Sequence, residues 1–154
     1  KWLGNIHIQE GRYLGKFQAR WYRTLRGEMI DGDMEWRETE VSRMQLKSVI
    51  ARVTRRGNRY EVFGFVLNDG TSLGSVEVQI DGGVWRPATL ESSNTQYSWK
   101  LFNYSWEGAT PGEHTLVSRV TDANGIVQPT EADLENKSTR LEHNAQFPRT
   151  VMIS

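Results

Sequence analysis

The sequence contains no cysteine among its 154 residues. Disulfides, thiolate chemistry and cysteine-ligated metal sites are therefore excluded. Net charge is absent as well, because 19 Lys and Arg residues balance 19 Asp and Glu residues. Binding to a phosphate backbone needs a basic excess, so we expect no nucleic acid partner. No apolar run approaches the roughly 18 residues of a membrane span, and we expect no membrane association. The first residues also lack the pattern of a signal peptide.

Motifs that would support catalysis by this chain alone are missing. The histidines lie in three distant regions, without metal-ligand spacing: His7, His114 and His143. The segment Asp31–Glu35 begins like a calcium loop, but such a loop needs Gly at its sixth position and Glu at its twelfth, where this chain has Trp36 and Ser42. No nucleophile-elbow motif and no phosphate-binding glycine loop is present. We therefore expect a binding or assembly role.

From about residue 46 onward, short alternating apolar and polar runs are separated by turn residues, which is typical of an all-β domain. The expected strands cover seven ranges: 48–53, 60–67, 75–80, 84–90, 97–101, 113–121 and 150–154. Asp81-Gly82-Gly83 predicts a tight turn, because glycine accepts the positive φ angles of hairpin turns. This number and spacing of strands predicts an immunoglobulin-like β-sandwich over residues 46–154. Residues 130–134 predict one short helical turn, with Thr130 as its cap.

Residues 1–45 differ from the rest and predict a strand followed by an extended arm. Ile6 and Ile8 alternate in an expected strand over residues 2–9. A basic and aromatic block over residues 12–26 precedes an acidic block over residues 31–40. Neighbouring blocks of opposite charge predict local neutralisation or a surface laid against another domain.

The tryptophans leave a second function open, that of a freestanding module that binds carbohydrate or protein. Trp85 and Trp99 fall on expected strands, where core packing is the common use of a large aromatic ring. Trp106 falls in a turn-rich stretch and is the better candidate for a contact surface. A carbohydrate platform would need several exposed rings in one plane.

Three stretches together carry a family resemblance. The first is Lys1-Trp2-Leu3 with Ile6, and the second runs from Ser75 to Trp85 and includes the Asp-Gly-Gly turn. The third contains Gln128-Pro129-Thr130 and, further on, Asn144-Ala145-Gln146. In this order and spacing they resemble the C-terminal dimerisation domain of sulfite-oxidase-type molybdenum enzymes, nearest to the bacterial sulfane dehydrogenase branch.

The resemblance implies a domain that holds two catalytic subunits together as a homodimer. A molybdopterin domain with the metal-binding cysteine would precede it in the same parent chain, and a periplasmic location is the family's expectation. Lys1 matches the last residue of a family segment that contacts the cofactor. Arg140 or Lys137 corresponds to a cation that the family projects towards the oxyanion pocket. The loop that contains Lys137 and Arg140 lacks the Arg-Gly pair usual in the family, so the resemblance does not specify the substrate.

Overall fold

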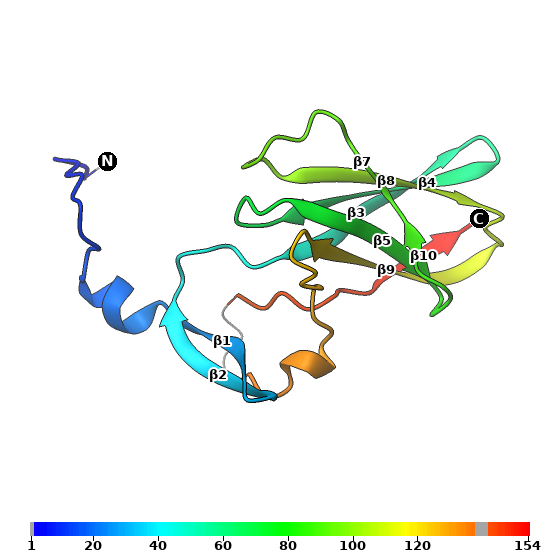
Figure 1. Ribbon diagram of the computed structural model, residues 1–154. Helices are drawn as coiled ribbons and strands as arrows, with labels where there is room; N and C mark the ends of the chain where they lie inside the picture. The colour runs from blue at the N-terminus through cyan, green and yellow to red at the C-terminus, as the bar shows by residue number, and fades with distance from the viewer. Residues whose placement is uncertain (1, 138–141) are drawn as a thin grey trace. The chain divides into compact units, whose positions relative to one another are not determined.

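A computed structural model describes residues 2–137 and 142–154, and the chain divides into two units (Figure 1). The larger unit comprises Arg43–Asn136 and His143–Ser154, and the smaller comprises Lys1–Ser42 and Lys137–Glu142. The expected division of the chain into 1–45 and 46–154, with the first part linking to a separate catalytic domain, stays a prediction.

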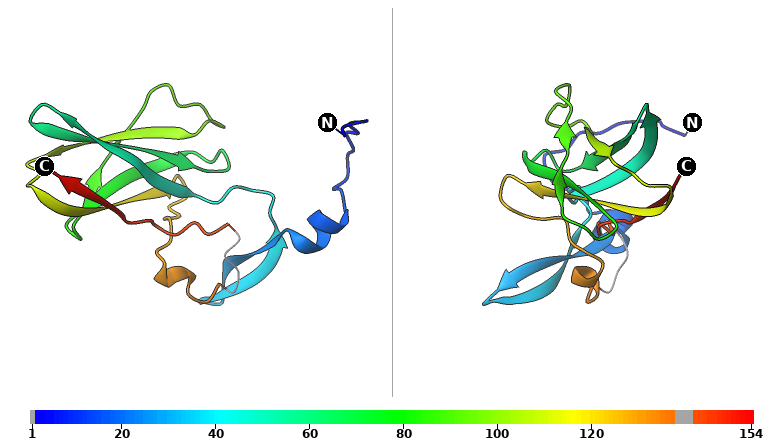
Figure 2. Two further views of the ribbon diagram at one scale, coloured as in Figure 1. Left: turned by 180° about the vertical axis from the view of Figure 1, so that it is seen from behind. Right: turned by 90° about the vertical axis from the view of Figure 1, so that its right-hand side faces the viewer.

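The larger unit is a sandwich of two antiparallel four-stranded sheets, seen from two further sides in Figure 2. One sheet has the order β3-β4-β8-β7, with bounds Lys47–Arg56, Arg59–Leu67, Lys100–Glu107 and Thr89–Leu90. The other has the order β10-β9-β5-β6, with bounds Arg149–Ile153, Gly112–Asp122, Leu73–Ile80 and Arg86–Pro87. This is the strand order of an immunoglobulin constant-type sandwich with one short extra edge strand. The predicted fold class is confirmed.

The core lies between the two sheets and follows from the alternation of side chains along each strand. Every second residue of β4 is buried at Val62, Gly64 and Val66, and every second residue of β5 is buried at Val76 and Val78. The remaining core residues come from both sheets: Ile50, Phe102, Trp106, Leu116, Val120 and Ile153. Glycine at position 64 has a specific reason, because a Cβ there would lie 2.5 Å from the Val49 carbonyl oxygen and would collide with the Phe102 ring.

The predicted turn after β5 is confirmed. Asp81 and Gly82 both have positive φ angles, 50° and 68°, and the Gly83 N–H donates to the Ile80 carbonyl at 2.9 Å. Two successive positive φ angles are the geometry of the primed hairpin turns, which suit the twist of antiparallel strands. Pro87 lies in β6 at the edge of its sheet, where a missing N–H does no harm.

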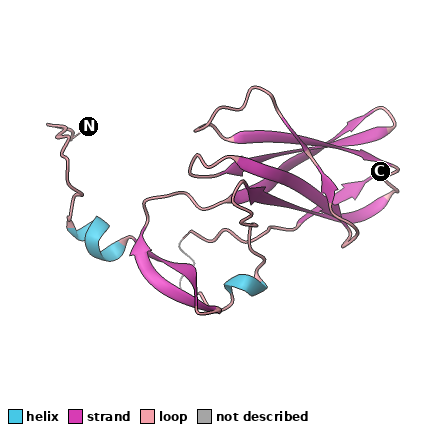
Figure 3. Ribbon diagram, viewed as in Figure 1, coloured by secondary structure: helices cyan, strands magenta, loops and turns pink. Residues whose placement is uncertain are grey.

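The smaller unit contains a two-stranded hairpin of β1 (Arg23–Ile30) and β2 (Asp33–Glu40), preceded by a π-helical turn, η1 (Phe17–Trp21) (Figure 3). The expected strand over residues 2–9 is wrong: those residues form no strand, and Ile6 and Ile8 are 78% and 91% exposed. Their alternation has no neighbouring strand to pair with in the described part of the chain. Asp31 and Gly32, the start of the rejected calcium-loop pattern, form the hairpin turn, with φ angles of 52° and 94°.

The two charge blocks form ion pairs with each other, which is the first of the two alternatives that their sequence left open. Arg12 lies 2.8 Å from Glu40, and Arg23 lies 2.9 Å from Glu38. The hydrogen bond from Arg12 lowers the pKa of the Glu40 carboxyl to about 2. These exposed pairs tie the basic block to the acidic strand.

A short helical turn is confirmed at η2 (Ala132–Leu134). The Asp133 N–H donates to the Thr130 hydroxyl at 3.2 Å, and the Thr130 hydroxyl donates to the Asp133 carboxylate at 2.7 Å. This reciprocal pairing satisfies donors at the start of the turn. Among the described residues, the helices are all too short to span a bilayer.

Candidate functional site

A buried polar network crosses the sandwich at the start of β3. Gln128 is 1% exposed, and its Oε1 accepts hydrogen bonds from the Ser48 N–H at 2.9 Å and from the Ser48 hydroxyl at 2.7 Å. Ser48 lies 3.0 Å from the Ser118 hydroxyl on β9. Gln128 Nε2 donates to the Asn144 carbonyl at 3.1 Å. Buried polar groups need such partners, and the network fixes β3 to the loops that follow β9.

The two segments of the third stretch in the family resemblance, residues 128–130 and 144–146, form hydrogen bonds with each other. The Gln146 N–H donates to the Pro129 carbonyl at 2.8 Å, and Gln146 Nε2 donates to the Gln128 carbonyl at 2.9 Å. Asn144 Nδ2 donates to the Leu46 carbonyl at 3.1 Å. The two segments of the motif therefore hold each other and the start of β3 in place through hydrogen bonds to backbone groups.

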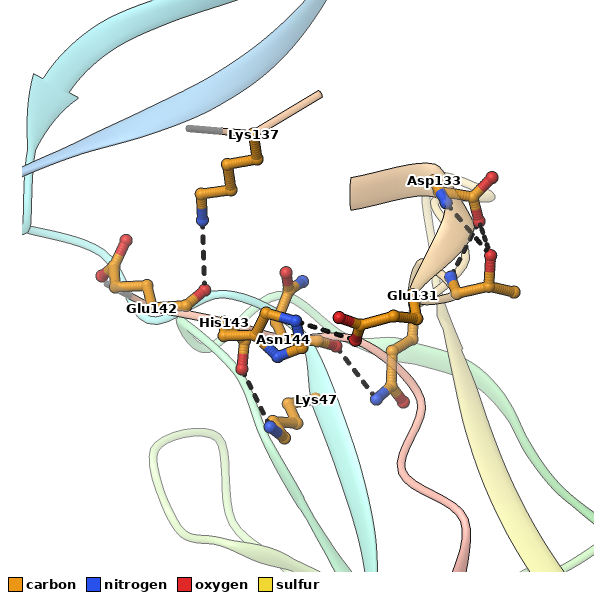
Figure 4. A network of polar contacts seen from close by, with 9 residues as sticks. Lys47, Glu131, Asp133, Lys137, Glu142, His143 and Asn144 are labelled. Carbon is orange, nitrogen blue, oxygen red and sulfur yellow. Dashed lines mark hydrogen bonds and ion pairs between the residues drawn. The ribbon is translucent and has the colours of Figure 1, made fainter. Parts of the chain in front are cut away.

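Two sets of charged side chains are drawn in Figure 4, one in each unit: His143, Glu131 and Lys47 belong to the larger unit, and Lys137 and Glu142 to the smaller. His143 Nε2 lies 2.9 Å from the Glu131 carboxylate, and Lys47 Nζ donates to the His143 carbonyl at 2.9 Å. The predicted site cation Lys137 is 7% exposed in the smaller unit and donates to the Glu142 carbonyl at 3.3 Å. Burial lowers the pKa of the Lys137 ammonium, Glu142 opposes this effect, and Arg26, which lies 3.7 Å from the Glu142 carboxylate, adds to it. The other two predicted site residues, Lys1 and Arg140, lie outside the described residues.

One histidine–carboxylate pair has the distance of a catalytic dyad, but both of its ring nitrogens are engaged within the chain. His114 Nδ1 lies 2.6 Å from the Asp81 carboxylate, and His114 Nε2 lies 2.8 Å from the Thr110 carbonyl. Both ring nitrogens face acceptors, which favours the imidazolium and raises the pKa of His114. A general base needs one free ring nitrogen directed at its substrate, and here neither is free. Over residues 2–137 and 142–154, no group of three His, Asp or Glu side chains is placed to bind a metal ion.

The tryptophan predictions were wrong for all three residues. Trp85 precedes β6 and lies outside the core, because the expected strand over residues 84–90 is divided into β6 and β7, which belong to different sheets. Trp106 lies on β8, is 6% exposed and packs edge-on against His114 at 5.0 Å, so it belongs to the core. Trp99 lies in the loop before β8 and is 60% exposed. Trp85 is half-buried beneath the Arg119 guanidinium, at 4.2 Å. The β8 strand begins later than expected, and this shift exchanges the roles of Trp99 and Trp106.

Trp99 belongs to an apolar outer face on sheet β3-β4-β8-β7. Its ring stacks on Phe65 with centroids 4.9 Å apart and planes inclined by 24°. Val49, Phe65 and Leu101 are register partners across three strands and form one apolar row. The alternation of side chains along residues 60–67 was the available signal for this face, because it puts Phe63 and Phe65 opposite Val62.

Comparison with known proteins identifies a solved structure with a similar fold. No family model matches the chain, and no curated protein matches it. Among solved structures, the sulfane dehydrogenase SoxCD from Paracoccus pantotrophus matches with a TM-score of 0.66 and 24% sequence identity over 90% of this chain. The match spans 36% of the SoxCD chain. At this identity the similarity establishes the fold: the chain has the architecture of one portion of a sulfane dehydrogenase chain.

Proposed function

We propose that this chain is the dimerisation domain of a molybdopterin-dependent oxidoreductase of the sulfite oxidase type, acting in the periplasm. The observation that carries the proposal is the structural match to about a third of a sulfane dehydrogenase chain over 90% of this one. The Gln128 and Asn144 segments support it, because the motifs that suggested the family form the hydrogen-bonded junction of the sandwich. The domain's role is to hold two catalytic subunits together.

The residues of this chain do not suit a molybdenum ligand set. A thiolate ligand is unavailable because the sequence has no cysteine. The described side chains include no cluster of three carboxylate or imidazole groups. In the proposal the molybdopterin is held by a preceding domain of the parent chain, and we derive no chemical step from this domain.

The proposal includes one contribution to the catalytic site, a cation for the oxyanion pocket. Lys137 supports this role, because a buried ammonium with a lowered pKa gains from a nearby anion. Arg140 is the alternative source of this cation, and Lys1 is a proposed cofactor contact. Both assignments rest on the family resemblance alone.

Sedimentation equilibrium tests the assembly role. We expect the chain to sediment as a dimer of about twice 17.7 kDa at micromolar concentration. A chain that stays monomeric at several hundred micromolar contradicts the proposal, since a dimerisation domain should associate well below that concentration.

The cation role is tested by titrating Lys137 with sulfate, used as a redox-inert oxyanion. We expect sulfate to raise the pKa of Lys137, followed by NMR of labelled lysine side chains, while the exposed Lys16 shifts little. Saturable sulfate binding, followed by calorimetry, should be present in the unchanged chain and absent from the Lys137→Met variant. An equal response of Lys16 and Lys137 would indicate general ionic screening and would contradict the role.

A further inference from the structure

We propose that two copies of this chain pair through the outer face of sheet β3-β4-β8-β7, with Trp99 as the central anchor. This inference rests on the proposed function, because it assigns the surface through which the proposed dimer forms. The apolar outer face is defined as the outward apolar side chains of this sheet, with Trp99 from the adjacent loop: Val49, Phe63, Phe65, Leu67, Leu101 and Trp99.

The two sheets differ in what they present outward. The β10-β9-β5-β6 sheet carries an ion pair on its outer side, Arg119 to Glu77 at 2.8 Å, and the Arg119 guanidinium also covers the Trp85 ring. Its polar groups therefore satisfy one another.

The β3-β4-β8-β7 sheet also carries an outward ion pair, Arg56 to Glu61 at 3.1 Å, and its Arg52 guanidinium lies over the Phe63 ring at 4.8 Å. It differs in having, beside these groups, an apolar row of Val49, Phe65 and Leu101 across three strands. Burial of an apolar centre surrounded by polar groups is the usual anatomy of a stable interface.

The loop that holds Trp99 is already ordered for binding. The Lys100 ammonium donates to the carbonyls of Thr95, Gln96 and Ser98, the latter two at 2.6 and 2.8 Å. The Asn94 side chain exchanges two 2.9 Å hydrogen bonds with the Leu101 backbone. An anchor fixed in advance loses little conformational entropy on binding, and exposed aromatic anchors provide a large share of interface energy.

The area of the face indicates a second copy rather than a short peptide. The four strands have 10, 9, 8 and 2 residues, and at about 3.4 Å per residue and 4.8 Å between strands they present a projected area of about 470 Å². A stable protein–protein interface needs about 800 Å² from each partner. The adjacent loop, where Tyr97 and Trp99 are 80% and 60% exposed, supplies the remainder. The face and its loop together reach the size that a dimer requires.

Charge complementarity agrees with self-pairing and selects its symmetry. Lys47 and Arg52 lie on β3 at one edge of the sheet, and Glu91 directly follows β7 at the opposite edge. A two-fold axis parallel to the strands lays the β3 edge of one copy over the β7 edge of the other, which brings opposite charges together. An axis across the strands would instead oppose the two β3 edges, with like charges facing each other.

Sedimentation equilibrium of the unchanged chain, Trp99→Ala and Met152→Ala tests whether the apolar outer face forms the dimer interface. We expect Trp99→Ala to raise the dimer Kd at least 30-fold, the size of a central anchor's loss. Met152→Ala is the matched control, because Met152 is 70% exposed on β10, away from this face; we expect its Kd to stay within threefold of the unchanged chain. A wild-type dimer that Trp99→Ala leaves intact overturns the face assignment alone, whereas a wild-type monomer overturns the proposed function.

Charge reversal provides a second test that does not depend on Trp99. Arg52→Glu and Glu91→Arg should each weaken the dimer, and the double variant should recover at least half of the lost free energy of association. No recovery overturns the strand-parallel two-fold. Cellohexaose is the probe for the competing use of this face: saturable quenching of Trp99 fluorescence in a monomeric wild-type chain would identify a carbohydrate platform and overturn pairing.

Discussion

His114 is a residue whose protonation state is set by two hydrogen-bond acceptors. The Asp81 carboxylate raises the pKa of His114 above 6.5, and His114 lowers the pKa of Asp81 below 3.8. The His114 contribution to stability is therefore complete below about pH 6.5 and is lost as pH rises through its raised pKa. The Asp81 contribution is complete above about pH 3.8 and is lost as pH falls through its lowered pKa.

The first prediction concerns the pH dependence of this pair. Asp81→Asn should lower the melting temperature most between pH 4.5 and 6, and the difference from the unchanged chain should shrink above pH 7. Asp69→Asn is the control, because Thr71 provides the main hydrogen bonds that lower the pKa of Asp69 and no histidine is involved. Its effect should be equal at pH 5.5 and pH 8. A pH-independent effect of Asp81→Asn would contradict the ion-pair description.

The second prediction concerns Gln128. Gln128→Leu keeps the side-chain volume but leaves the buried Ser48 N–H without its acceptor. One unsatisfied buried donor costs about 1–3 kcal/mol, and the loss of the further bonds adds to it, so we expect a loss of about 2–4 kcal/mol in urea unfolding. The exposed Gln96→Leu should change the unfolding free energy by less than about 0.5 kcal/mol. Equal changes in unfolding free energy for Gln128→Leu and Gln96→Leu would show that the buried network does not contribute to stability.

At the scale of the element, the loop before β8 depends on one ammonium group. Lys100 is 9% exposed, and its donors bind three carbonyls of residues 95–98. The ammonium takes the place that a bound cation would occupy among loop carbonyls. The loop therefore keeps a defined shape although its side chains face solvent.

The third prediction follows from this arrangement. Lys100→Met retains most of the side-chain stem and removes the donors, so amide hydrogen exchange over residues 94–99 should accelerate at least tenfold. Exchange in β4 should be unchanged, because Val62 and Val66 remain packed. Uniform acceleration across the sandwich would indicate global destabilisation and would contradict a local role.

The strands were largely predictable, because each of the long strands has one buried face and its side chains alternate with a period of two. Val76 and Val78 show this pattern in β5, as do Leu116 and Val120 in β9. The expected strand around Ile6 failed because alternation does not reveal whether a neighbouring strand exists. The hairpin β1–β2 was missed because its strands are highly charged, with Arg26 opposite Arg37 and Glu28 opposite Glu35. Such like-charge pairs are unfavourable in isolation, and here Arg37 is relieved by Glu28 at 3.6 Å and by Glu35 at 3.4 Å.

At the scale of the whole molecule, the two units differ in internal stability. The hydrophobic core cluster lies entirely within the larger unit. The smaller unit has one two-stranded hairpin, and a lone hairpin in water is marginally stable at best. Three exposed basic residues precede the hairpin: Arg12, Lys16 and Arg20.

The fourth prediction is a proteolysis pattern. Brief trypsin treatment should cleave within residues 12–26 at least tenfold faster than within the long strands β4 and β9. Mass spectrometry should identify a persistent fragment that retains the sandwich. Cleavage within β4 or β9 at a comparable rate would contradict the separation into units of unequal stability.

The candidate site was predictable only in part, for a physical reason. The motif segments around Gln128 and Asn144 were recognised, but their mutual hydrogen bonds depend on the folded path of the chain. Ser118 carried the available signal, since a polar residue between Leu116 and Val120 on an apolar face requires a buried partner. The family resemblance indicated Lys137 as a site residue, but the sequence did not predict that its side chain is buried.

The Gln128 network has a consequence for how quickly the chain reaches its native state. Ser48 and Gln128 are 80 residues apart in the sequence, and Leu46 and Asn144 are 98 apart. Contacts this distant along the chain require the closure of a long loop before they contribute any stability. The strand β3 itself pairs with β4 across a short turn, so the late event is the closure of the Gln128 and Asn144 hydrogen bonds. We expect this closure among the last events of refolding, on a timescale of milliseconds to seconds.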